Sequence, residues 1–130
     1  MFAHAARTFE PTDHAPRQAR LFVKECLAAW GLTGITDPLV LAVSELTTNA
    51  VTHGTGAINV TLRTNDRRVR IQVENLGAGT PVMRAPESPE RITGGMGLRL
   101  VDTVADDWGV DARANTTSVW FEHGLQVEPD

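Results

Sequence analysis

The feature that most constrains this chain is a change of hydrophobic periodicity at residues 54–57. Before it, the segment DPLVLAVSELTTNAVTHG (37–54) places apolar residues three or four positions apart, as one buried face of an α-helix requires. After it, AINVTLRT (57–64) and RRVRIQVEN (67–75) alternate apolar and polar residues, which is typical of strands with one buried face. The Asn-Asp pair between them favours a tight turn, so the two segments predict a β-hairpin. A helix is thus followed at once by a sheet that it can cover.

Two helices are predicted before the hairpin from their end signals. The helix at residues 37–54 should begin with Asp37 as its N-cap, carry Pro38 in its first turn and end at Gly54. A helix is also predicted at residues 13–31, with Asp13 as its N-cap. The apolar face of this first helix is mainly Leu21, Val23, Leu27 and Trp30.

The rest of the chain predicts the remaining elements of the same two layers. A third helix is expected at residues 97–109, and three more strands are expected at residues 6–10, 108–114 and 116–123. Strands joined mostly by hairpins, with the helices gathered together, predict an α+β fold. We expect a two-layer α/β sandwich, in which a mixed, mostly antiparallel sheet carries the helices on one face.

Composition argues against several classes of function. The chain has 130 residues and a net charge of −4 without a cluster of Lys or Arg, so we expect no direct contact with nucleic acid. Its single cysteine, Cys26, cannot form an internal disulfide and is interpreted as a small buried hydrophobic residue. No apolar run approaches the roughly 20 residues of a membrane span, and the N-terminus lacks a signal-peptide pattern. We expect residues 1–130 to form one cytoplasmic domain without membrane contact, its core at about residues 8–122.

Three polar residues stand four positions apart on the helix at residues 37–54. Glu45, Asn49 and His53 border the expected apolar face, which consists of Leu39, Val43, Leu46 and Ala50. One interpretation is a solvated helix face with a cation at its C-terminal end, which suits the helix dipole. The other is the floor of a pocket, because carboxylate and amide oxygens suit Mg²⁺ and a carboxylate can activate a hydroxyl or water that attacks phosphate. Zinc is disfavoured, since the chain has neither an HExxH pair nor a cysteine cluster.

Glycines stand on both sides of a long segment without periodicity, residues 76–95. TGGMGLRLV (93–101) places glycines at the start of the expected third helix, where free N–H groups and the helix dipole attract phosphate. This segment is not a P-loop, and GAGTPV (77–82) lacks the third glycine of a dinucleotide fingerprint. Taken alone, the glycines at the start of the expected helix are explained more simply by a plain turn than by a phosphate site.

Taken together and in order, these motifs resemble a known family. SELTTNAVTHG (44–54) is similar to the N box, VENLGAG (73–79) to the first glycine box and GGMGLRLVDTVADDWG (94–109) to the second glycine box of the Bergerat-type ATP-binding domain. Gyrase-type ATPases, a class of heat-shock chaperones, histidine kinases and mismatch-repair ATPases share this domain. The small bacterial anti-sigma-factor serine/threonine kinases are the branch that this chain resembles most.

The resemblance implies roles for individual residues. Glu45 would be the catalytic base, Asn49 the Mg²⁺ ligand and residues 81–94 a lid over the nucleotide. The further residues expected to bind ATP are His53, Asn75, Gly77, Gly79, Gly95, Met96, Gly97, Leu98 and Thr117. The family usually carries an aspartate where this chain has Asn75. The amide oxygen can still accept a hydrogen bond from adenine, but without charge assistance. We therefore expect weaker ATP binding, and tighter binding after Asn75→Asp.

The resemblance also implies partners. An anti-sigma kinase uses Mg²⁺ and ATP to phosphorylate a serine or threonine of an anti-anti-sigma factor, and it holds a sigma factor inactive. A homodimer is a further expectation, and Phe22 is interpreted as an exposed side chain that would serve it. The alternative is a regulatory protein of the same fold that acts by protein contacts with weak nucleotide binding or none.

Overall fold

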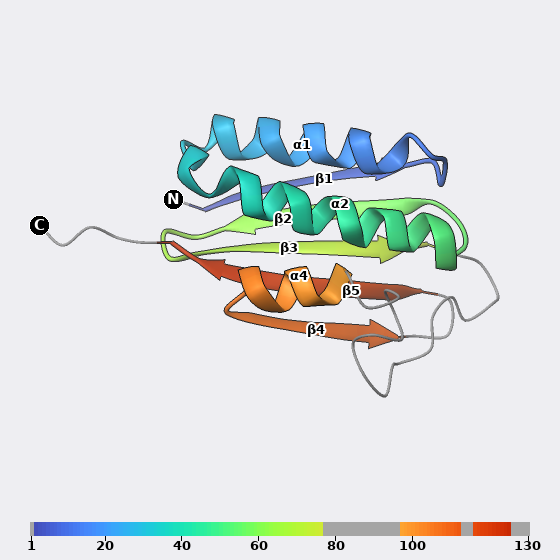
Figure 1. Cartoon of the computed structure of the whole chain (residues 1–130). Coiled ribbons are helices and arrows are strands. Elements are labelled where there is room, and N and C mark those ends of the chain that lie inside the picture. Colours follow the sequence, from blue (N-terminus) through green and yellow to red (C-terminus); the bar gives the residue numbers. More distant parts are fainter. Residues whose placement is uncertain (1, 77–96, 113–115, 126–130) are drawn as a thin grey trace, which may run out of the picture.

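The computed structural model describes residues 2–76, 97–112 and 116–125. Its elements, in chain order, are β1 (Ala3–Phe9), α1 (Ala15–Ala29), the 3₁₀ helix η1 (Thr33–Ile35), α2 (Thr36–His53), β2 (Ile58–Thr64), β3 (Arg68–Asn75), α4 (Gly97–Val104), β4 (Asp107–Ala112) and β5 (Thr117–Gly124). The strands form a five-stranded sheet in the order β1-β2-β3-β5-β4. Helices α1, α2 and α4 lie on one face of this sheet (Figure 1). The predicted two-layer α+β fold is confirmed, and every strand pairing in the described residues is antiparallel.

The core lies between the sheet and helices α1 and α2. Alternate side chains of β2 and β3 are buried on the helix side, as the periodicity predicted: Ile58, Val60, Leu62, Val69, Ile71 and Val73. The strand register places Ile71 opposite Phe121 of β5 and Val73 opposite Val119, so the buried face continues across the sheet. The predicted apolar face of α2 is also buried: Leu39, Val43, Leu46 and Ala50.

The hairpin forms at the predicted turn. The side-chain oxygen of Asn65 accepts hydrogen bonds from the backbone N–H groups of Arg67 and Arg68, both at 2.9 Å. On the face of the sheet away from the helices, Arg68 and Arg70 pair with Glu122 at 3.1 and 3.2 Å. The guanidinium of Arg70 also lies 4.1 Å from the centre of the Trp120 ring. Arg67, Arg68 and Arg70 therefore belong to a solvated turn and strand.

Helix α1 differs from its prediction at its start and on its surface. It begins at Ala15, and Asp13 is not its cap: His14 takes the cap position without a side-chain hydrogen bond. Phe22 is only 6% exposed, whereas Leu21 is 49% exposed. The interpretation of Phe22 as a surface residue and the placement of Leu21 on the apolar face are therefore both wrong. Phe22 shares a helical stripe with buried Ala15 and Ala19, and its ring meets Phe9 edge-on at 6.0 Å.

Cys26 of the same helix is partly buried against the core. Burial raises the pKa of its thiol, and Glu25 adds to this effect while Arg7 opposes it. The thiol therefore stays protonated near neutral pH and serves as a small apolar group.

Helices α2 and α4 also differ from their predictions at their ends. Helix α2 begins at Thr36, so Asp37 lies inside its first turn and is not the cap. A carboxylate in the first turn suits the helix dipole. The expected C-cap, Gly54, is confirmed. Helix α4 ends at Val104, earlier than predicted, because the N–H of Asp106 already pairs with the carbonyl oxygen of Glu122 in β5 at 2.8 Å. The turn expected at residue 115 lies outside the described residues.

Within the described residues, no helix combines the length and apolar character that crossing a membrane requires.

Candidate functional site

Most of the predicted site residues that the structure describes lie at one end of the molecule, while Glu45 stands near the middle of α2. Helix α2 and strand β3 end there, while β5 and α4 begin there (Figure 1). Asn75, the last residue of β3, stands opposite Thr117, the first residue of β5. Both side chains are 1% exposed, on the helix side of the sheet. Residues far apart in the sequence therefore form a buried polar pair under the end of α2.

The three polar residues of α2 differ in burial. Glu45 is half-buried, Asn49 is 7% exposed, and His53 in the last turn is exposed. Helix α4 packs against α2, with Val101 buried between the layers. The solvated-face interpretation therefore holds for His53 but not for Asn49, which lies beside the core. The pocket-floor interpretation stays a prediction.

Asn49 has a buried polar atom that is not satisfied. Its side-chain nitrogen, Nδ2, is buried and has no hydrogen-bond partner. It is the one such side-chain atom among the described residues. An unpaired buried donor costs about 1–3 kcal/mol, and native proteins pair the large majority of these groups. The Nδ2 group of Asn49 thus has hydrogen-bonding capacity that the protein itself does not use.

Asn75 is held in one orientation by the end of α2. Its Nδ2 donates a hydrogen bond to the carbonyl oxygen of Ala50 at 3.1 Å. The same oxygen accepts the N–H of Gly54 at 3.0 Å. Gly54 leaves room for this contact, because a Cβ there would clash with Nδ2 of Asn75 and stand 2.6 Å from the Ala50 oxygen. Since a carbonyl oxygen can only accept, the amide must turn its NH₂ group toward the helix.

The sequence motifs of this chain match a known family. The profile of the histidine kinase-like ATPase domain matches residues 9–122. The chain belongs to this family. Among curated proteins no significant sequence match is found.

A solved structure supports the fold of this ATPase domain. The crystal structure of the RsbU and RsbW domains of Rv1364c from Mycobacterium tuberculosis is similar, with a TM-score of 0.71 and 24% sequence identity. The match covers 93% of this chain but 32% of that one, so the ATPase domain spans about a third of its neighbour. At this identity the likeness shows the fold.

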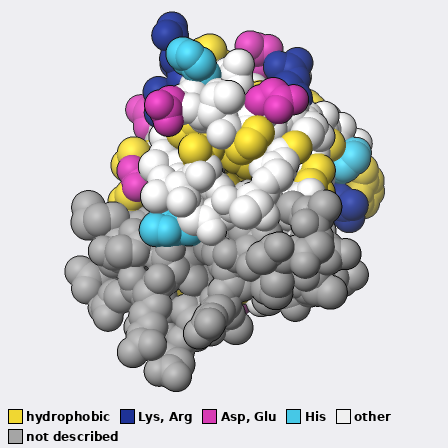
Figure 2. All heavy atoms as spheres, turned by 90° about the vertical axis from the view of Figure 1, so that its right-hand side faces the viewer, with side chains coloured by type: hydrophobic (Ala, Val, Ile, Leu, Met, Phe, Trp, Pro, Cys, Tyr) yellow, Lys and Arg dark blue, Asp and Glu magenta, His cyan; other side chains and the backbone are white. Residues whose placement is uncertain are grey.

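The glycine boxes of the ATPase domain are described only at their edges. Gly77, Gly79, Gly95, Met96 and the expected lid at residues 81–94 lie outside the described residues. Gly97 and Leu98 are the first residues of α4. Figure 2 views this end of the ATPase domain directly, with charged side chains gathered toward the top and hydrophobic ones nearer the centre of its described part.

Sequence reasoning missed two contacts that hold α2 of the ATPase domain in place. One is the contact of Asn75 with Ala50, since Gly54 was interpreted only as a helix stop. The other joins the first two helices: Arg20 of α1 donates to the side-chain oxygen of Ser44 at 2.7 Å, one residue before Glu45. No spacing rule signals either contact, because each joins segments that meet only in the folded chain.

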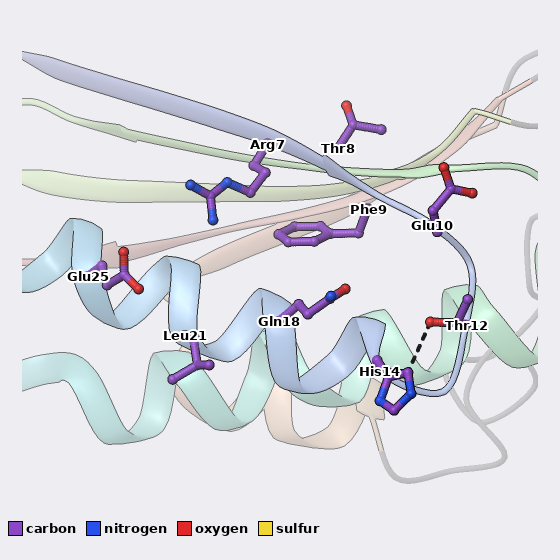
Figure 3. Close-up of a pocket in the computed structure, with 9 residues that line it drawn as sticks. All are labelled: Arg7, Thr8, Phe9, Glu10, Thr12, His14, Gln18, Leu21 and Glu25. Carbon is purple, nitrogen blue, oxygen red and sulfur yellow. Dashed lines mark hydrogen bonds between the residues drawn. The ribbon is translucent and has the colours of Figure 1, made fainter.

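A separate groove of about 620 Å³ lies between β1 and α1 (Figure 3). Phe9 and Leu21 supply its apolar surface, and Arg7, Glu10 and Glu25 are among its charged residues. None of the predicted site residues lines it. This groove is therefore distinct from the candidate site of the ATPase domain.

Proposed function

We propose that this chain binds ATP together with Mg²⁺ and acts as a protein serine/threonine kinase of the anti-sigma type. The observation that carries the proposal is the buried Asn49 amide with its unpartnered Nδ2. It lies one turn after Glu45 on α2, at the end of the molecule where Asn75 and Thr117 meet. Membership of the histidine kinase-like ATPase family supports ATP as the ligand, since the matched domain is an ATPase domain.

The donor set at α2 fits a magnesium–nucleotide complex. Mg²⁺ keeps several waters and takes few protein ligands besides phosphate oxygens, so a single amide oxygen from Asn49 is enough. The unpartnered Nδ2 of the same amide is then free to donate to a phosphate oxygen. Mg²⁺ held there would neutralise phosphate charge during transfer.

Glu45 is the residue proposed to act as base. Its half-buried carboxylate stands one helical turn before Asn49, on the same side of α2. There it can orient the hydroxyl group of a serine or threonine and take its proton as the oxygen attacks the terminal phosphate. The bond from Arg20 to Ser44 anchors the helix immediately before this carboxylate.

The remaining predicted residues would complete the nucleotide site. Asn75 and Thr117 would hold the base at the buried end, and His53 would lie at its exposed rim. The glycines at 77, 79, 95 and 97, with Met96 and Leu98, would bring backbone N–H groups to the phosphates under a lid at residues 81–94.

The proposed partners are proteins. A kinase of this type would phosphorylate an anti-anti-sigma factor and bind a sigma factor. The similarity to the structure of the RsbU and RsbW domains supports a regulatory role through protein contacts. The proposal includes a single domain over residues 1–130, a cytoplasmic location and a homodimer. It includes no direct contact with nucleic acid or membrane.

One observation favours a second function, a regulatory protein that acts by contacts alone. Asn75 carries no charge and uses its NH₂ group on Ala50, so its base contact lacks the strength of a charge-assisted bond. Calorimetry with ATP and ADP, each with and without Mg²⁺, separates the two functions. Binding that is tighter with Mg²⁺, together with phosphate transfer to a partner, supports the kinase. If no heat of binding is detected at millimolar nucleotide, the kinase function is eliminated.

A further inference from the structure

Asn75 makes a contact that couples the sheet to the helix that carries Glu45 and Asn49. Its Nδ2 donates to the carbonyl oxygen of Ala50, in the last full turn of α2 and directly after Asn49. That oxygen thus accepts one hydrogen bond from the cap of its own helix, at Gly54, and one from strand β3. The end of α2 is therefore fixed by the side chain that closes β3.

The polarity of this contact admits a donor only. A carboxylate carries acceptors alone, so an aspartate at position 75 would turn an oxygen toward the Ala50 oxygen in a place that is 1% exposed. The side chain has no room to turn toward Gly54, where even an added Cβ would stand 2.5 Å from Cγ of Asn75. A neutral amide or a protonated acid satisfies the contact, and a carboxylate does not.

We propose that Asn75 is a positioning residue, which ties β3 to the last turn of α2 and thereby holds Asn49 in place, and that this site requires a neutral amide here. The part of this inference that concerns ATP binding rests on the proposed function. It reverses the expectation from the family resemblance: Asn75→Asp weakens ATP binding in this chain instead of tightening it.

The first test compares Asn75→Asp with a matched change, Asn65→Asp. The Asn65 oxygen only accepts N–H groups, which a carboxylate does equally well, so this control keeps its contacts. In calorimetry, Mg²⁺-ATP should bind about tenfold more weakly to Asn75→Asp, which corresponds to about 1.4 kcal/mol, and unchanged to Asn65→Asp. Because the effect acts through Asn49, it should be larger with Mg²⁺ than in EDTA. Binding to Asn75→Asp that equals or exceeds the wild type overturns the proposal.

The second test needs no nucleotide. In Asn75→Asp, the protonated carboxyl group can donate to the Ala50 oxygen, so folding favours the protonated form and raises its pKa above the unfolded value of about 3.9. The loss of Tm against wild type should therefore be full above the raised pKa and fade as the pH falls toward 4. Asn75→Ala, which cannot donate at any pH, should show a loss that does not fade.

In the described part of the chain, the surroundings of position 75 add no titratable group that differs between the variants. The residues opposite it on β2 and β5 are Ile58 and Thr117, which do not titrate. His53 is the titratable side chain in the last turn of α2, and it is exposed and common to all variants. A loss in Asn75→Asp that is independent of pH overturns the proposal. If the wild type binds no ATP, the proposed function fails, while the Tm series still decides the role of Asn75.

Discussion

Replacing Gly54 by alanine should test how tightly the end of α2 is packed against β3. A Cβ at this position would clash with Nδ2 of Asn75 and stand 2.5 Å from its Cγ and 2.6 Å from the Ala50 carbonyl oxygen. The backbone itself tolerates alanine, because φ is −96° and ψ is −179° at Gly54. The expected effect is therefore steric and acts on the Asn75–Ala50 contact.

The magnitude follows from three contributions to the free energy of unfolding. Overpacking costs about 1–3 kcal/mol, and loss of the hydrogen bond from Asn75 to Ala50 costs about 0.5–1.5 kcal/mol. The reduced freedom of the unfolded chain returns about 0.4–1 kcal/mol. The net loss is about 2 kcal/mol, or a Tm lower by about 8 °C for a chain of this length.

Urea unfolding and thermal scans measure this loss directly, with Gly34→Ala as the control. A Cβ at Gly34 would meet no atom within 4 Å, so this variant should stay within about 0.5 kcal/mol of wild type. Adding Asn75→Ala to Gly54→Ala should recover part of the loss, since one of the two clashing groups is gone. A Gly54→Ala protein as stable as wild type would refute the packing described here.

Three further changes test other parts of the molecule. Glu45→Gln should lower the rate of phosphate transfer to a partner protein at least about 100-fold and leave the calorimetric affinity for Mg²⁺-ATP nearly unchanged; equal loss of both would indicate a structural role. Asn49→Ala removes an unsatisfied donor, so the free energy of unfolding in urea should change by no more than about 1 kcal/mol. The gain in ATP affinity on adding Mg²⁺ should disappear in this variant, and a gain that persists would show that Asn49 does not bind the metal. Gly109→Ala would bring a Cβ to 2.8 Å from the Trp120 indole and should lower the free energy of unfolding by about 1–3 kcal/mol; unchanged stability would mean that the indole moves freely.

The sequence predicted the fold well, because periodicity reports directly on burial. The alternation in the hairpin and the apolar face of α2 both correspond to buried residues. Element ends were less predictable: Asp37 and Asp13 are good cap residues, yet α2 begins before one and α1 after the other. Phe22 and Leu21 show the same limit, since adjacent positions differ by 100° around the helix and the pattern allowed either to face the core.

The contacts of the candidate site residues were not predictable from the sequence. The family resemblance suggested Asn49, Asn75 and Thr117 as site residues, and the strand register brings the last two together. The hydrogen bond from Asn75 to Ala50 depends on how β3 passes under α2, which no local pattern encodes. For that reason the expected benefit of an aspartate at position 75 could be questioned only with the structure in hand.

The pairing of β3 with β5 also bears on the order in which the protein folds. β2 and β3 join across a short turn, whereas β3 meets β5 only after residues 76–116 have been brought round. Closing a loop of this length loses chain entropy before any contact compensates for it, so such non-local pairings form late. Asn75 and Thr117 become neighbours at that step. A ligand that binds between these residues would therefore bind only chains in which β3 and β5 have paired. During refolding, such a ligand would stabilise the completed sheet.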